Sequence, residues 1–171
     1  MIENECKKRS KTMDVDKLKS LRQANQLDEA RKLALSLLED HPHDPDILLQ
    51  TAYIHDQQDM APQAISFYKQ ALEHDLNLED RREALLCLGS SYRAVGLYEL
   101  ARETLEIGMS EYPDYNAFYI FFAMTLYNLD DTDLAMEFLM TKLLETTDDE
   151  SIKAYSRALE FYSSRLDEVF N

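Results

Sequence analysis

An alanine recurs at nearly constant spacing along the chain, within four segments of similar pattern. The four residues are Ala30, Ala64, Ala101 and Ala135, and the intervals between them are 34, 37 and 34 residues. A period of this length is typical of stacked units, each too small to bury its own apolar face. The fold must therefore place equivalent residues of successive units against one another.

Turn-forming residues lie at the same offset before each of these alanines. They are Asn25, Asp59, Gly96 and Asp130. Small residues precede three of the turns, at Ala52, Gly89 and Ala123, where they allow the two helices of a unit to approach closely. The 171 residues include only three glycines and four prolines, which favours helix. Each unit is therefore predicted to be helix, tight turn, helix.

These residues and their spacing resemble the tetratricopeptide repeat. The third unit carries most of the family's marked residues, namely Leu85, Leu88, Gly89, Tyr92, Gly96, Ala101 and Pro113. Residues 75–113 also resemble one bacterial subgroup of the family, which has a lengthened junction between its second and third units and no assigned biochemical role. The resemblance implies an all-α fold, a right-handed superhelical stack of helix-turn-helix repeats with a C-terminal capping helix.

The repeat register divides the chain into a tail, four hairpins and a cap. The hairpins are predicted at about 11–44, 45–81, 82–115 and 116–149, after a mobile polar tail over 1–10 and before a capping helix over 150–171. Acidic residues at the start of the last segment suit a helix N-terminus. Its apolar residues recur three and four apart and predict one buried stripe, made of Ile152, Tyr155, Leu159, Tyr162, Leu166 and Val169.

The charge and cysteine content limit the classes of partner and compartment. There are 33 acidic and 18 basic residues, a formal net charge of -15, so nucleic-acid binding is not expected. The two cysteines, Cys6 and Cys87, do not form a disulfide framework and fit a reducing compartment. No apolar stretch follows the charged start of the chain, so no signal peptide is expected and the predicted location is cytoplasmic.

The most apolar stretch, FYIFFAMTLY over residues 118–127, raises the question of what covers it. It is too short for a bilayer span, which needs about 20 apolar residues, so no membrane association is expected. The repeat register assigns part of it to the core, namely Tyr119, Phe122, Ala123 and Leu126.

No residue pattern in the chain indicates catalysis. The sequence HPHDPD at 41–46 contains potential metal ligands, but the repeat explains it as punctuation, with Asp44 as a helix N-cap and Pro45 at the first helical position. No phosphate-binding loop or nucleophile elbow is recognisable. We therefore expect a non-enzymatic protein with no catalytic residues, no metal and no cofactor.

The remaining candidate site is a surface. In this family the first helix of each hairpin lines the concave face, which here would contain Lys19, Arg22, Leu49, Tyr53, Leu86, Ser90, Arg93, Ile120, Met124 and Tyr127. Such a groove suits an apolar peptide segment with acidic neighbours. The primary hypothesis is accordingly a protein-protein interaction module whose concave face binds a peptide or protein segment.

Two alternatives explain the same apolar surface. A homodimer, or a capping helix folded inward through Ala158 and Phe161, would cover it, since soluble monomers rarely leave large apolar patches bare. The first of these makes the chain a self-assembling scaffold. A small acidic chaperone for a client protein is a further alternative that no motif selects.

Overall fold

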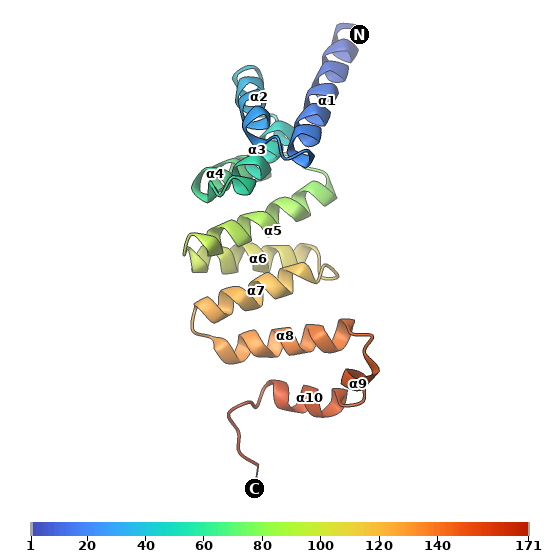
Figure 1. The fold of residues 1–171 in the computed structure, drawn as a ribbon, viewed down its shortest axis with the longest axis vertical. Coiled ribbons are helices and arrows are strands. Elements are labelled where there is room, and N and C mark those ends of the chain that lie inside the picture. Colours follow the sequence, from blue (N-terminus) through green and yellow to red (C-terminus); the bar gives the residue numbers. More distant parts are fainter. Residues whose placement is uncertain (1, 171) are drawn as a thin grey trace.

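The chain is a single column of stacked helices in the computed structural model, which describes residues 2–170 and the side chains of 13–170 (Figure 1). No strand occurs between residues 2 and 170. The helices in order are α1 (Ile2–Gln23), α2 (Leu27–Asp40), α3 (Pro45–Gln57), α4 (Ala61–Leu72), α5 (Leu78–Ala94), α6 (Tyr98–Glu111), α7 (Ala117–Asn128), α8 (Thr132–Thr146), α9 (Glu150–Lys153) and α10 (Ser156–Ser163).

Consecutive helices pair into four hairpins, α1 with α2, α3 with α4, α5 with α6, and α7 with α8. The second helix of each hairpin also packs against the first helix of the next, so the hairpins stack in chain order (Figure 1). The first helices contact one another in the series α1, α3, α5, α7 and form one continuous face. The predicted all-α array of helical hairpins is confirmed.

The four predicted turn residues all adopt the left-handed backbone conformation. Their φ angles are 57° at Asn25, 58° at Asp59, 80° at Gly96 and 63° at Asp130. In each case the next residue donates its backbone N–H to the carbonyl five positions earlier, which closes the end of the first helix. Glycine, asparagine and aspartate are the residues that accept this conformation at least cost, which explains their recurrence.

The recurring alanines are buried where the two helices of each hairpin and the next hairpin meet. Ala30, Ala64 and Ala101 are fully buried, and Ala135 is 4% exposed. Three clusters of buried apolar side chains fill the stack, one between each pair of neighbouring hairpins. The core is therefore distributed along the column, as expected for units that cannot fold alone.

The apolar stretch at 118–127 forms α7 and is only partly what the register predicts. Phe122, Ala123 and Leu126 are buried, which confirms three of the four expected core positions. Tyr119 is only half-buried, because its ring faces α8, where the Lys142 ammonium lies 3.9 Å from the ring centroid. Among residues 2–170 no helix has the length and apolar character needed to cross a bilayer.

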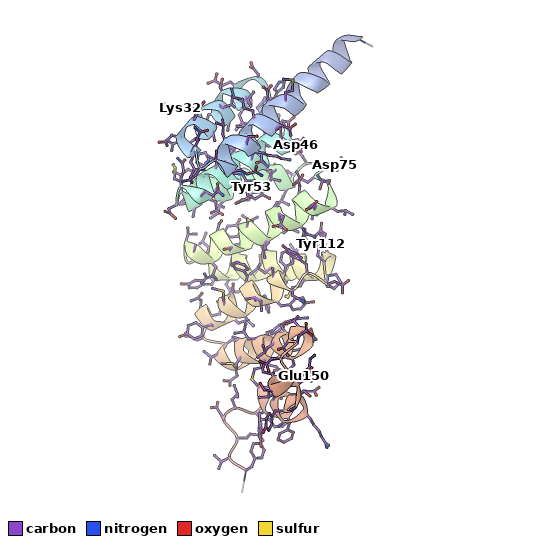
Figure 2. The ribbon with its side chains drawn as sticks, turned by 45° about the vertical axis from the view of Figure 1, so that its right-hand side comes forward. Lys32, Asp46, Tyr53, Asp75, Tyr112 and Glu150 are labelled. Carbon is purple, nitrogen blue, oxygen red and sulfur yellow. The ribbon has the colours of Figure 1, made fainter. Side chains whose placement is uncertain are left out.

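Phe118 is an aromatic core residue of this stretch that the register missed. Its side chain is fully buried against Gly108 of α6, where any side chain would collide with the ring. Tyr112, at the turn between α6 and α7 (Figure 2), stacks on it at 6.2 Å, and Tyr115 meets it edge-on at 5.7 Å. The absence of a side chain at Gly108 thus allows the close contact between the third and fourth hairpins.

The N-terminal helix begins earlier than the predicted hairpin. α1 starts at Ile2, so helix extends through the stretch 1–10 that was assigned to a polar tail. The predicted mobility of that stretch stays a prediction. The first helix is consequently the longest of those described, and its N-terminal half projects beyond α2 (Figure 1).

The single capping helix predicted over 150–171 is wrong, because the chain bends after α9. The Tyr155 N–H bonds to the Ile152 carbonyl, three residues earlier, and α10 restarts from Tyr155 and runs back along α8 (Figure 1). α10 then ends at Ser163, whose hydroxyl donates to the Glu160 carbonyl at 2.8 Å. Serine side chains compete with the helical backbone in this way.

The break also overturns the predicted buried stripe. Four of its six residues are exposed, Tyr155 at 68%, Tyr162 at 45%, Leu166 at 48% and Val169 at 84%. The bend changes the helical register, so that Ser163 becomes the buried residue of α10. The cap therefore presents apolar side chains outward.

Replacing Gly108 with alanine is expected to destabilise the fold. Overpacking against the buried Phe118 ring costs about 1–3 kcal/mol, which exceeds the roughly 1 kcal/mol that alanine gains over glycine within a helix. Urea unfolding should show a lower midpoint for Gly108→Ala, with Ser110→Ala on the exposed side of α6 as the control. An unchanged or higher midpoint for Gly108→Ala would show that the contact is not tight.

Candidate functional site

The face formed by the first helices contains most of the predicted groove residues, but two of them are not accessible. Leu49 is 1% exposed and Leu86 is 8% exposed, because the first helix of the following hairpin covers each of them. They belong to the core, and their assignment to a partner-binding surface is wrong. Leu49 packs in the cluster of the second and third hairpins, and Leu86 in that of the third and fourth.

At the N-terminal end of this face, Arg22 and Tyr53 lie in contact. The Arg22 guanidinium carbon lies 4.9 Å from the Tyr53 ring centroid, and its Nε donates to Gln50 Oε1 at 3.3 Å. Tyr53 lies on α3 near the end of α1 (Figure 2) and meets Tyr68 edge-on. Lys19, one turn before Arg22, is half-buried on α1.

The middle of the face contains a partly buried carboxylate, Asp56. It accepts a hydrogen bond from Ser91 Oγ at 3.1 Å and another from the Tyr68 hydroxyl at 3.4 Å. Burial raises the pKa of the Asp56 carboxyl, against the two hydrogen bonds, which lower it. Burial also raises the pKa of the nearby Cys87 thiol to about 11, so this cysteine is protonated at neutral pH and is not an activated nucleophile.

At the C-terminal end the face becomes apolar and open. Ile120 and Met124 are each 38% exposed and Tyr127 is 66% exposed, all three on α7 as predicted. The Arg93 Nη1 atom donates to Asn128 Oδ1 at 3.2 Å, while its Nε atom is buried without a hydrogen-bond acceptor. A buried donor without an acceptor is costly. The Nε atom has no contact with solvent, whereas the Arg93 side chain as a whole is half-buried and borders the face.

A cavity of about 390 Å³ lies beside these residues. Its lining comes from α5, α7 and α8, and consists of Arg93, Ala123, Met124, Tyr127, Asn128, Thr132, Ala135, Met136 and Leu139. Three of the predicted groove residues, Arg93, Met124 and Tyr127, thus meet at one site. Ser90 lies half-buried one turn before Arg93, outside this cavity lining.

Sequence reasoning missed the α8 wall of the cavity, which includes Met136 and Leu139. The repeat register assigns second helices to the far side of each hairpin, so only first helices were considered as groove lining. The sequence does contain a relevant signal, because Met136 and Leu139 lie close to the recurring Ala135, at positions where a following helix would pack. This signal indicates an exposed site only when the capping helix is known to leave Met136 and Leu139 uncovered.

The histidine-rich turn at 41–46 separates α2 from α3 and provides the N-cap of α3, as predicted. The Asp44 carboxylate accepts hydrogen bonds from the backbone N–H groups of Asp46 and Ile47, and so caps α3. Across residues 13–170, no group of three or more histidine, cysteine, aspartate or glutamate side chains is arranged to hold a metal ion. What the described face offers chemically is apolar contact area with a guanidinium at its edge.

The chain belongs to the family described as Tetratrico peptide repeat, whose model matches residues 45–166. Repeats of this family generally mediate protein-protein interaction. The first predicted hairpin precedes the matched region and joins the array through the packing of α1 and α2 on α3.

Among solved structures, the chain is similar to one described as the crystal structure of MamA. The TM-score is 0.68 at 18% sequence identity, over 84% of this chain and 86% of that one. At this identity the likeness shows the fold alone. No curated protein matches the sequence significantly.

Asp56 is expected to make stability depend on pH. Since burial raises its pKa in the folded state, its contribution is fully present below the unfolded value, near 3.8, and is lost as pH rises through the folded value. Asp56→Asn should therefore raise the urea midpoint at pH 7, and this gain should shrink as the pH falls toward 4.

The matched control is Asp130→Asn, at the equivalent turn of the fourth hairpin, because the neighbouring charge of Asp59 itself helps to raise the pKa of Asp56. Asp130 sits at a left-handed turn position that asparagine also accepts. Equal effects of the two substitutions at all pH values would contradict the role given to the buried carboxyl of Asp56.

Proposed function

We propose that this protein is a non-enzymatic interaction module that binds a peptide or protein segment on the face formed by α1, α3, α5 and α7. The observation that carries the proposal is the exposure of Ile120, Met124 and Tyr127 on α7, beside the cavity that Arg93 borders. Exposure of these apolar side chains to water is unfavourable, and a bound partner segment would remove them from water.

The chemistry of this surface indicates which residue types the bound segment contains. Methionine and tyrosine side chains adapt to varied apolar shapes and are enriched at protein interfaces. Arg93 is half-buried at the cavity wall, and a carboxylate of the partner would accept a charge-assisted hydrogen bond from the accessible part of its guanidinium. The segment is accordingly apolar with at least one acidic residue, and it engages the C-terminal half of the face most strongly.

A second candidate function is self-assembly, and the cap favours it. Phe161, Tyr162 and Phe170 are 46%, 45% and 54% exposed, and their ring centroids lie 5.4–5.7 Å apart. The Arg165 guanidinium carbon lies 4.6 Å from the Phe161 ring centroid. These aromatic side chains form a separate patch that a second copy of the chain would cover. No contact within residues 13–170 favours the third alternative, a small acidic chaperone.

Replacing Tyr127 with alanine is expected to weaken peptide binding without affecting the fold. The test is selection of displayed random peptides of about 12 residues, long enough to cross several first helices, on the full chain, followed by titration of the best synthetic peptide. Tyr127→Ala should weaken the affinity for that peptide about tenfold or more. Tyr155→Ala, at an equally exposed tyrosine of the cap, is the matched control. Unchanged affinity in Tyr127→Ala would remove this end of the face from the proposed site.

Replacing Phe161 with glutamate tests self-assembly through the cap. If the aromatic patch is a dimer contact, light scattering after size-exclusion chromatography should give a dimer mass for the natural chain and a monomer mass for Phe161→Glu, because a buried charge would be left unpaired. Ile107→Glu, at an equally exposed apolar residue of α6, should leave the mass unchanged. A natural chain that is monomeric over the whole dilution series rejects this candidate.

A further inference from the structure

Equivalent residues of successive hairpins have very different exposures at the C-terminal end of the stack. Leu49, Leu86 and Ile120 occupy the same repeat position, and they are 1%, 8% and 38% exposed. The first two are covered by the first helix of the next hairpin. Ile120 is uncovered, because α7 packs on both α5 and α6 while the principal packing of α10 is on α8.

The cap is too short to complete a fifth position in the stack. α10 has only 8 residues, compared with 17 in α5 and 12 in α7. It returns beneath α8 and the chain then leaves the column after Ser163 (Figure 1). The α8 side of the 390 Å³ cavity lies on the N-terminal half of that helix, from Thr132 to Leu139.

We propose that an amphipathic helix of a partner protein docks into this cavity and takes the place of the first helix of a fifth hairpin. This inference rests on the proposed function and names the form of the bound segment. In this chain every earlier hairpin receives a helix on the same side, since α3, α5 and α7 each pack on the hairpin before them. Ala123 and Ala135 contribute small side chains to the cavity wall and permit a close approach.

The charges around the cavity define the docking helix further. Its apolar side chains meet Met124, Tyr127 and Met136, and an acidic residue next to them accepts from the guanidinium of Arg93, which lines the same cavity. A helix running in the direction of α7 ends near the α7–α8 turn, where Asp130 and Asp131 are exposed. Basic residues in its last turn therefore complement that rim.

A second copy of this chain is a poorer occupant than a distinct partner. Each copy carries a formal net charge of -15, so two copies repel one another. The turn beside the cavity is itself acidic, with Asp130, Asp131 and Asp133 exposed. A partner helix with a basic last turn is attracted to the same rim.

The experiment compares two displayed peptide libraries on the full chain. One has apolar residues at helical spacing over about four turns, with acidic positions beside them and lysine at the end. The other has regularly placed prolines, which prevent helix formation. The best peptide from each is synthesised and titrated by fluorescence anisotropy against the natural chain and four variants whose folding is checked by circular dichroism.

The variants separate the cavity from the rest of the face. Met136→Glu places a charge on the α8 wall, which a helix in the fifth position would touch and a segment confined to the first helices would not. Ser90→Glu places the same charge on α5 outside the cavity lining. Arg93→Gln removes the guanidinium at the cavity wall. Arg102→Gln removes a guanidinium from the opposite side of the stack, where it pairs with Glu99.

The expected result is a binder from the helical library that Met136→Glu and Arg93→Gln each weaken about tenfold or more. Ser90→Glu and Arg102→Gln should leave its affinity unchanged. A glutamine in place of the peptide's acidic residue should cause the same loss as Arg93→Gln, and the two changes together should cost no more than either alone.

Other results overturn the inference in distinguishable ways. Suppose that only the proline library yields a binder, and that its affinity is lost in Ser90→Glu but unchanged in Met136→Glu. This result would reject the docked helix and would support a segment bound along the concave face. No binder from either library would reject both the helix and the proposed function. A dimer that Met136→Glu converts to monomer would identify a second copy as the occupant and would reject a distinct partner.

Discussion

The structure depends on the fact that no hairpin of this chain can bury its own apolar surface. Each hairpin is completed by the first helix of the next, which covers residues such as Leu49 and Leu86. The close approach that this requires comes from side chains of minimal size, including fully buried Ala64 and Ala101. At the junction of the third and fourth hairpins the contact is closer still, because Phe118 fills the space left by Gly108. The stability of the fold therefore comes mainly from the interfaces between hairpins, because a single hairpin is unstable without its neighbours.

An array built in this way always has an end to cover, and this chain covers its C-terminal end only in part. α10 packs on α8 of the last hairpin, and Ser163 is buried where a longer apolar helix was expected. Ile120 and the neighbouring Met124 consequently keep more than a third of their surface exposed. The same local bend turns Tyr162 toward solvent. The two apolar surfaces proposed for binding and for self-assembly thus have a common cause, which is the short and broken cap.

The charged groups along the face of the first helices differ in their surroundings. Near the N-terminal end, Arg22 is engaged by Gln50 and by the ring of Tyr53. In the middle, the partly buried carboxyl of Asp56 is held by hydrogen bonds. At the C-terminal end, Arg93 bonds to Asn128 and lines a cavity together with exposed apolar side chains. A charged group beside exposed apolar surface offers a ligand both a hydrogen bond and exclusion of water. This combination is why the proposed contact lies at one end of the stack.

The sequence by itself determined the all-α array, the hairpin register, and the left-handed turns at positions such as Asn25 and Gly96, because these follow from local periodicity and backbone preference. It also assigned Met124 and Tyr127 to the face of the first helices, but it left open whether that face is covered. Only the tertiary structure decided that Leu86 is covered while its equivalent Ile120 is not, and that Met136 of α8 joins the site. Exposure at a repeat position depends on whether another helix follows it in space, and that depended here on a bend at Tyr155 that the apolar spacing of the last segment did not signal.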